Sequence, residues 1–340
     1  MTGEDEFTIE DKIAPAASAA RRVAAIDCGT NSLRLLLADV DPVQHTLHDL
    51  DRRMEIVRLG QGVDKTGRLA PEALRRTLDA LRVYAEAIDA GQIDAIRMVA
   101  TSATRDAANA AEFTQGVVDV LGIEPEVLTG DEEARLSFAG ATAEFGGVSR
   151  PPAPPYLVLD IGGGSTEFVL GGLSAAGRGS GAREVDAISV NIGCVRMTER
   201  HLHGDPPTQP QIAAAIEDID AAVAAAAEKV PIAEARSLIG LAGSVTTVAA
   251  VALDLPGYDA ASIHHSRIAA SQVRAVTSLL LAQTRAERAQ IPSMHPGRVD
   301  VIGAGALVLD RVMRRFGFAE VVVSEHDILD GLAWSMAPPQ

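Results

Sequence analysis

The sequence predicts an α/β protein built from two domains that open with the same pattern. Residues 23–41 read VAAIDCGTNSLRLLLADVD, and residues 157–170 read LVLDIGGGSTEFVL. Each stretch has an apolar run ending in an aspartate, Asp27 or Asp160, then a turn rich in glycine and hydroxyl groups, then a second apolar run. Short apolar runs bounded by glycine are typical of strands. Because 340 residues suffice for two domains of roughly 150 residues each, we expect two domains whose turns face each other across a cleft.

The two turns are candidate phosphate-binding loops. Glycine lets backbone N–H groups converge on an anion, and serine and threonine add hydroxyl donors. A single turn of this kind is also compatible with an ordinary hairpin, but the repetition favours a pair of phosphate loops. Aligning Asp27 with Asp160 places Arg34 on Glu167, so only the second copy carries an extra carboxylate. The candidate phosphate-binding residues of the two copies are Asp27, Gly29, Thr30, Asn31, Ser32, Gly162, Gly163, Gly164, Ser165 and Thr166.

The composition argues against nucleic acid and membrane partners. The net charge is −16 and only 3% of the residues are aromatic, so neither attraction to polyanions nor stacking on bases is expected. Residues 1–21 lack the basic and apolar regions of a signal peptide and are predicted to form a disordered tail. The longest apolar stretch, 238–255, is interrupted by glycine and threonine, which argues against a membrane span. We expect a cytoplasmic protein.

In the first domain, a strand over 52–60 and a helix from Pro71 to Gly91 are expected after the hairpin, since proline suits the first helical position. A buried strand over 96–100 then runs into TSATRD. Hydroxyls and an arginine at the carboxyl end of a strand lie where α/β folds bind ligands. Arg105 is therefore a candidate phosphate contact. The alternative is that Ser102 or Thr104 only caps a helix over 109–118.

Residues 129–135, TGDEEAR, begin a helix at the end of the first domain. Thr129 and Glu132 have the spacing of a capping box, in which each side chain satisfies a backbone N–H group of the other residue. Successive helical residues point in different directions, so Glu133 is left without a structural role close to the cleft. The alternative is that Glu132, Glu133 and the preceding Asp131 all complement the helix dipole.

The second domain continues with a glycine- and serine-rich loop over 171–183 and a strand over 184–191. Gly193 and Cys194 begin a helix, and this junction can present N–H groups to an anion. Further elements follow the same rules of periodicity and punctuation. They are a helix over 211–229, a strand, turn and helix over 237–250, a last strand over 321–324 and a last helix over 327–334.

Seven segments of the chain occur together in a known order: DCGTNS, DIGGGSTE, ATSATRDAAN, GDEEAR, GCVRMTE, GLAGSVTT and HPGRVDVIGAG. On these segments the chain resembles the exopolyphosphatase/guanosine pentaphosphate phosphohydrolase (Ppx/GppA) family of the actin and sugar-kinase superfamily. The resemblance implies two ribonuclease-H-like (actin-like ATPase) α/β domains with an interdomain cleft. Domain I would span 22–133 and domain II 134–325, with the last helix, in 326–340, packing back on domain I. It also implies the short form of the family, with the catalytic core only, and a homodimer.

The same resemblance implies an Mg²⁺-dependent hydrolase that releases terminal orthophosphate from inorganic polyphosphate. The family assigns catalysis to the glutamate that matches Glu133, which would orient and deprotonate the attacking water. Asp160, Glu167 and Asp27 would hold Mg²⁺, or Mn²⁺ in its place; a monovalent cation is a further candidate. The alternatives for the first two are that Asp160 caps its hairpin and that Glu167 pairs across strands.

The remaining candidates lie further along the chain. Arg105 and Arg298 would grip phosphates beyond the terminal one, because arginine suits bidentate phosphate contacts. Cys194 would lie beside the phosphate without being reactive. Its place next to Gly193 is better explained by the need for a small residue.

Three other functions remain possible on the sequence alone. The same residues would serve to hydrolyse guanosine pentaphosphate to the tetraphosphate. An actin-like ATPase or sugar kinase would share the fold, but no segment indicates a sugar pocket. A non-catalytic sensor of polyphosphate or of the guanosine compound would not need Glu133, so the presence of that residue beside the aspartates speaks against it.

Overall fold

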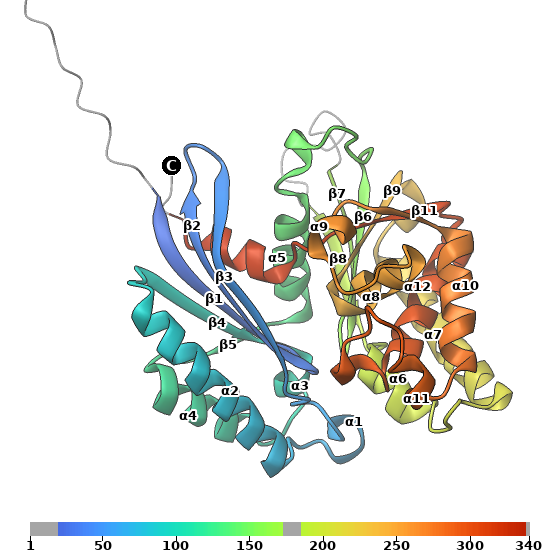
Figure 1. Ribbon diagram of the computed structural model, residues 1–340, viewed down its shortest axis with the longest axis horizontal. Coiled ribbons are helices and arrows are strands. Elements are labelled where there is room, and N and C mark those ends of the chain that lie inside the picture. The colour runs from blue at the N-terminus through green and yellow to red at the C-terminus, as the bar shows by residue number, and fades with distance from the viewer. Residues whose placement is uncertain (1–19, 173–184, 338–340) are drawn as a thin grey trace, which may run out of the picture.

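The computed structural model describes residues 20–172 and 185–337 (Figure 1). The predicted tail over 1–21 lies outside the described residues except for its last two, and the predicted loop over 171–183 lies outside them except for its first two. The described chain forms two separate mixed sheets flanked by helices, which confirms the predicted α/β class. No helix in the described ranges is both long and apolar enough to cross a membrane.

The first domain is a five-stranded sheet covered by helices on both faces. Its strands are β1 (Arg21–Cys28), β2 (Ser32–Asp41), β3 (Thr46–Ile56), β4 (Ala95–Ala100) and β5 (Glu126–Val127), in the order β3-β2-β1-β4-β5. Helices α2 (Pro71–Ala90) and α4 (Ala110–Leu121) pack on one face, against residues such as Ile26. The opposite face, which includes Val23, is covered by α13 (Ile328–Ser335), the last helix of the chain. Alternate side chains of β1 therefore point to opposite faces of the sheet and pack against different helices.

Short helices connect these elements. They are α1 (Val63–Thr66) and α3 (Ser102–Arg105). The helix predicted from Pro71 to Gly91 is α2, with Pro71 in its first turn and Gly91 at its C-cap. Strand β3 begins at Thr46, earlier than the predicted start at 52. Because β3 is an edge strand whose side chains are all exposed or half-buried, its first half has no apolar periodicity from which it could be predicted.

The second domain is a six-stranded sheet in the order β10-β11-β9-β6-β7-β8. Its strands are β6 (Tyr156–Ile161), β7 (Thr166–Gly171), β8 (Val185–Val190), β9 (Ser237–Leu241), β10 (Arg267–Ala269) and β11 (Glu320–Val323). Its helices are α6 (Cys194–Arg200), α7 (Gln209–Lys229), α8 (Ala242–Ala252), α9 (Ala260–Ile263), α10 (Ala270–Ala282), α11 (Arg285–Arg288) and α12 (Ile302–Phe316), with 3₁₀ turns η1 (Phe145–Gly147), η3 (Ile232–Glu234) and η4 (Pro296–Arg298). The large core lies between the sheet and the layer of α6, α7, α8, α10 and α12. Helix α5 (Gly130–Thr142) covers the other face.

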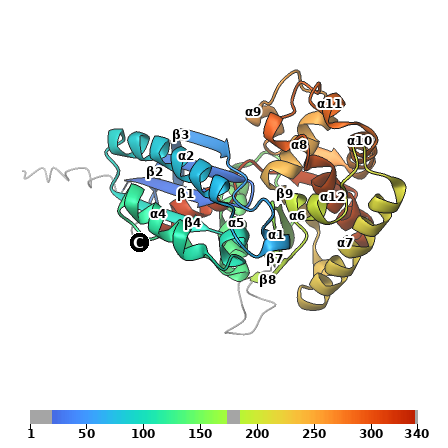
Figure 2. The same cartoon turned by 90° about the horizontal axis from the view of Figure 1, so that it is seen from below.

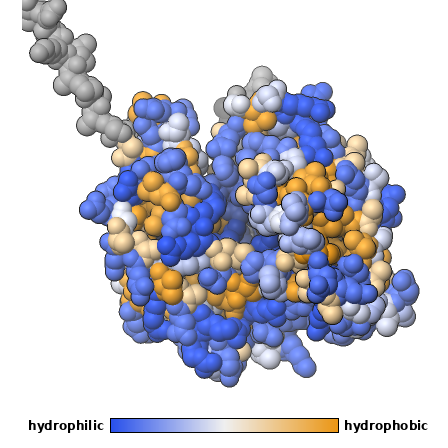
Figure 3. All heavy atoms as spheres, in the orientation of Figure 1, coloured by the Kyte–Doolittle hydropathy of each residue, from blue (hydrophilic) through white to orange (hydrophobic). Residues whose placement is uncertain are grey.

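The two domains meet around the first domain's α1 and the second domain's α6, which lie side by side when the molecule is seen from below (Figure 2). Asp64 accepts two bonds from Arg200, at 2.7 and 2.8 Å, and the backbone N–H of Gly62 donates to Glu199 at 3.0 Å. Above this contact the surface is hollowed between the domains (Figure 3). The hollow leads to the place where the two hairpin turns approach each other.

Candidate active site

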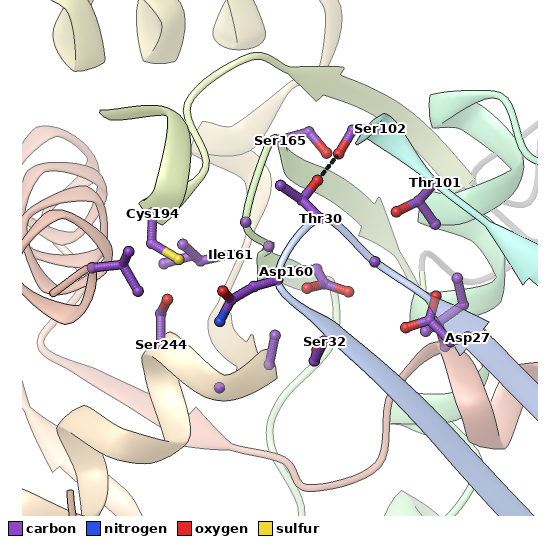
Figure 4. Close-up of a pocket in the computed structure, with 18 of the residues that line it drawn as sticks. Asp27, Thr30, Ser32, Thr101, Ser102, Asp160, Ile161, Ser165, Cys194 and Ser244 are labelled. Atoms are coloured by element: carbon purple, nitrogen blue, oxygen red, sulfur yellow. Dashed lines mark hydrogen bonds between the residues drawn. The ribbon is translucent and has the colours of Figure 1, made fainter. Parts of the chain in front are cut away.

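A cavity of about 90 Å³ lies where the β1–β2 turn and the β6–β7 turn face each other (Figure 4). Both hairpins are antiparallel and in matching register, with Asp27 opposite Arg34 and Asp160 opposite Glu167. The predicted site residues that line the cavity are Asp27, Gly29, Thr30, Asn31, Ser32, Glu133, Asp160, Gly162, Gly163, Ser165, Cys194 and Arg298. The structure thus brings together two segments that the sequence related only by their similarity.

The glycines of the second turn allow the two turns to touch. A Cβ on Gly163 would lie 2.9 Å from the Cβ of Thr30, and a Cβ on Gly164 would lie 2.6 Å from the Oγ of Ser102. Thr30 and Ser102 are themselves joined by a hydroxyl hydrogen bond of 2.8 Å (Figure 4). Close approach of the domains is therefore a second reason for glycine here, beside phosphate binding.

The junction before α6 holds the second turn from behind. The N–H groups of Cys194 and Val195 donate to the carbonyl oxygens of Gly162 and Gly163, both at 2.9 Å. These two N–H groups are consequently occupied by the loop, and the expectation that they face an anion is wrong. Cys194 does line the cavity, but burial raises the pKa of its thiol, so the thiol is not an activated nucleophile.

Asp27 and Asp160 lie at the ends of the central strands of their sheets, and both are buried. One oxygen of Asp27, Oδ2, accepts from the Nε and Nη2 of Arg34 at 3.1 and 2.6 Å, whereas Oδ1 is buried and has no hydrogen-bond partner among the described residues. Asp160 accepts from the Oγ of Ser137 at 2.7 Å. Burial, and next the charge of Asp327, raise the pKa of Asp160 to about 6.

Glu167 lies behind the cavity and does not line it. Its carboxyl is buried and accepts from the Oγ of Ser189 at 2.7 Å. Burial, and next the charge of Asp160, raise the pKa of Glu167 to about 8. Thr166 is turned away as well, since its hydroxyl donates to the carbonyl of Ile192 at 3.0 Å.

These carboxylates fit a hard divalent cation. Asp27, Asp160 and Glu167 offer only oxygen ligands, the donors that Mg²⁺ prefers. The raised pKa values show that the negative charges lack compensation from the protein, and the Oδ1 atom of Asp27 is a buried acceptor without a donor. The chemistry of these residues therefore suits a cation at this edge of the cavity. Of the three, however, only Asp27 and Asp160 line the cavity, and the three carboxylates are not among the described groups whose ligand atoms all lie within 4.8 Å of one another.

Glu133 reaches the cavity from the first turn of α5. The predicted capping box between Thr129 and Glu132 is confirmed, and Glu133, the next residue, is buried and lines the cavity. Burial, and next the charge of Glu167, raise its pKa well above the ordinary value, while Arg105 opposes this shift. The Nη1 of Arg105 lies 3.2 Å from the Oε2 of Glu133 and donates to the carbonyl of Leu128 at 2.8 Å. Arg105 does not line the cavity; it contacts Glu133 instead.

Arg298 occupies the opposite wall, where its Nη1 donates to the carbonyl of Gly243 at 3.1 Å and to the Oγ1 of Thr247 at 3.0 Å. Beyond it lies a second chamber of about 470 Å³. The two cavities share four lining residues: Arg34, Ala242, Gly243 and Arg298. The larger chamber is lined in addition by apolar side chains that include Met54, Tyr258, Met294 and Leu329.

Several lining residues were absent from the sequence-based set: Arg34, Thr101, Ser102, Ala242, Gly243, Ser244, Ile161, Val301, Ile302 and Ile328. A signal existed for some of them. Thr101 and Ser102 follow the carboxyl end of a buried strand, and Arg34 aligned with a site candidate. Gly243 and Ser244 belong to the small-residue segment after β9, which the sequence predicted as a turn and which the structure shows as the start of α8. The apolar residues gave no signal, because they differ in no way from core residues.

The fold and the cavity together define the class of protein. It is a two-domain, actin-like α/β protein with a cavity between the domains that is lined by acidic residues and is large enough for a phosphate.

The sequence profile of the Ppx/GppA phosphatase family matches residues 37–340. Exopolyphosphatase 2 of Mycobacterium tuberculosis is 48% identical over 93% of this chain and 98% of that protein. An exopolyphosphatase-like protein of known crystal structure is 45% identical in sequence. Its structure matches with a TM-score of 0.86 over 93% of this chain and 98% of that one. An Aquifex aeolicus member of the Ppx/GppA family is 30% identical, with a TM-score of 0.74 over 93% and 97%. The chain belongs to the Ppx/GppA phosphatase family and is a hydrolase.

Proposed function

We propose that the chain is an exopolyphosphatase, which hydrolyses the terminal phosphoanhydride bond of inorganic polyphosphate and releases orthophosphate. The observation that carries the proposal is the placement of Glu133, a buried carboxylate with no capping role, on the wall of a cavity formed by two glycine- and hydroxyl-rich turns. The relatives named as exopolyphosphatases support the choice of substrate.

The turns bind and orient the terminal phosphoryl group. Residues 29–32, 162, 163 and 165 of the two turns line a space of about 90 Å³, which suits a single phosphoryl group and a water. Glu133 accepts a proton from that water while the oxygen of the water attacks phosphorus. The bond from phosphorus to the bridging oxygen, on the side opposite the attacking water, breaks. The next phosphate of the chain leaves with the bridging oxygen, and Arg298 lies on the side by which the chain leaves.

Asp27, Asp160 and Glu167 would hold Mg²⁺ or Mn²⁺, which would neutralise the negative charge of the phosphoryl oxygens. The chain needs such help, because its net charge of −16 opposes the approach of a polyanion. Arg34 and Arg105 do not supply it, since both are engaged by carboxylates of the protein. A monovalent cation and a homodimer remain part of the proposal, to be tested by salt substitution and by sedimentation.

The first test is orthophosphate release with Mg²⁺ from short and long polyphosphate, guanosine pentaphosphate and ATP, compared between wild type, Glu133→Gln and Glu132→Gln. Glutamine preserves a capping box, so Glu132→Gln is a matched control on the same helical turn. Loss of the general base should lower kcat about 10²–10⁴-fold in Glu133→Gln, with the control close to wild type. Near-normal turnover by Glu133→Gln would exclude Glu133 as the base.

Guanosine pentaphosphate is a second candidate substrate, which the larger chamber favours. A chamber of about 470 Å³ with Tyr258, Met54 and Met294 on its walls suits an organic group better than it suits another phosphate. Faster release from the pentaphosphate than from polyphosphate would favour this activity, with the same catalytic residues. Binding of either compound without release would indicate a sensor.

A further inference from the structure

The guanidinium of Arg34 lies between two carboxylates that come from opposite ends of the chain. Its Nε and Nη2 donate to Oδ2 of Asp27 on β1, and its Nη1 donates to Oδ2 of Asp327, which precedes α13. Both carboxylates are buried, and only a fifth of the Arg34 side chain is exposed. Arg34 and Asp27 line the cavity, whereas Asp327 stands behind Arg34 and lines only the larger chamber.

Asp327 is fixed by its own segment. Its Oδ1 accepts from the N–H of Leu329 at 3.0 Å as the N-cap of α13, and its N–H donates to Asp330 at 2.8 Å. Asp330 is in turn paired with Arg52 at 2.6 Å. This leaves Oδ2 of Asp327 as the oxygen that meets Arg34.

Helix α13 is also held against α5, the helix that carries Glu133. The two helices cross with backbone in contact at two glycines. A Cβ on Gly140 of α5 would overlap the carbonyl oxygen of Asp327, and a Cβ on Gly331 of α13 would overlap the carbonyl oxygen of Leu136. Asp327 is therefore held in a fixed position relative to the helix that bears the proposed base.

We propose that Asp327 is a positioning residue of the hydrolytic site. It binds Nη1 of Arg34, the guanidinium nitrogen that does not donate to Asp27. Arg34 therefore keeps its hydrogen bonds to Oδ2 of Asp27, and Oδ1 of Asp27 remains unpaired for the cation. Without Asp327, Nη1 of Arg34 is free to move toward the phosphate or toward Asp160, with which Arg34 already interacts electrostatically. The inference rests on the proposed hydrolysis for its kinetic test and on the proposed cation site for its binding test.

The test compares Asp327→Asn with Asp330→Asn. Asparagine is as good an N-cap as aspartate, so the first variant keeps the cap and loses the charge on Arg34. The second also loses a buried charge paired with an arginine at the start of α13, but Arg52 is not a residue of the phosphate cavity. We expect Asp327→Asn to lower kcat on tripolyphosphate at least tenfold with KM changed less than threefold, and Asp330→Asn to keep kcat within twofold. A kcat for Asp327→Asn within twofold of wild type overturns the inference.

Action through Arg34 is tested by combining each variant with Arg34→Gln. In that background Asp327→Asn should cause no further loss of kcat, whereas a merely structural effect would multiply with that of Arg34→Gln and would overturn the inference. Thermal denaturation and near-ultraviolet circular dichroism check folding. Asp327→Ser, which also caps a helix without charge, replaces Asp327→Asn if the latter does not fold.

Calorimetric titration with Mg²⁺ separates this inference from the proposed function. Asp327→Asn should bind Mg²⁺ at least fivefold more weakly than wild type, and Asp330→Asn should bind it equally well. A wild-type protein that binds Mg²⁺ but releases no orthophosphate contradicts the proposed function alone. Mg²⁺ binding that is the same in all three proteins, or absent from all three, overturns the inference.

Discussion

Arg105 and Glu133 form an ion pair of 3.2 Å beside the cavity, and through it a residue expected to bind phosphate instead contacts the proposed base. The charge of Arg105 lowers the pKa of Glu133, against the larger effects of burial and of Glu167. Glu133 can accept a proton only when it is ionised, so Arg105 extends the active range toward lower pH.

Arg105→Gln should therefore move the acidic limb of the kcat profile toward higher pH. The measurement is orthophosphate release between pH 5 and 9. Arg97→Gln, which breaks an ion pair with Glu126 at 2.7 Å away from the cavity, is the control and should leave the profile in place. An acidic limb that does not move in Arg105→Gln would show that the pair has no part in catalysis.

Gly193 allows α6 to lie directly against the second turn, and a Cβ there would overlap the backbone of Gly163 and Gly164. Since backbone cannot yield as a side chain can, Gly193→Ala should displace the turn, lower kcat more than tenfold and reduce the melting temperature by several degrees. Gly147→Ala is the control, because a Cβ on Gly147 meets nothing within 4 Å. Activity and melting temperature of Gly193→Ala equal to those of the control would contradict the contact.

The buried carboxyls predict a pH dependence of stability in the metal-free protein. The pKa of Glu167 is about 8 in the folded protein, against 4.5 for an ordinary glutamate, so between these values the folded state binds more protons than the unfolded state. Stability must then fall as pH rises, by up to about 1.4 kcal/mol per pH unit for such a group. Below pH 6.5 a half-buried histidine, His265, with its pKa lowered to about 4 mainly by burial, acts in the opposite direction.

The effect of Glu167 on stability is consequently best measured between pH 6.5 and 8, where His265 does not oppose it. Urea unfolding in the presence of a chelator should show stability falling across this window in wild type and in the control Glu112→Gln, an exposed position. The fall should be smaller in Glu167→Gln, and it should be smaller in wild type once Mg²⁺ is added. A slope that Glu167→Gln leaves unchanged would show that another group is responsible.

Asp64 connects the domains through Arg196 and Arg200, at 3.3 and 2.7 Å. Pairs with partial exposure contribute about 1 kcal/mol or less each, which is enough to shift a balance between closed and open arrangements several-fold. Asp64→Asn should increase the radius of gyration measured by small-angle X-ray scattering. Asp218→Asn removes a partner of Arg200 within the second domain and should not. Equal radii for both variants would mean that other contacts keep the domains closed.

The sequence was sufficient for what depends on neighbours in the chain. The two hairpins follow from apolar runs on either side of a turn, and the capping box of Thr129 and Glu132 depends on a spacing of three residues, which the structure confirms. The placement of Glu133 at the cavity follows from the same local geometry. Its role as base stays a prediction.

What the sequence did not predict depends on distances between remote residues. Nothing near Asp327 indicates that it meets Arg34, since the two approach only when the last helix packs on the first sheet. Arg105 follows a strand beside the site, as its place in the sequence predicts, but the direction of its side chain is decided by the carbonyl of Leu128 and by Glu133, both contributed by a later segment.

The packing of α13 on the face of β1 and β2 that includes Val23 and Leu36 also constrains the order in which the molecule forms during synthesis. Chains leave the ribosome from the N-terminus, and domains tend to fold as they emerge. Here one apolar face of the first sheet stays without its cover until α13 has been translated. The first domain to appear is therefore completed only after the strands and helices of the second domain have been made.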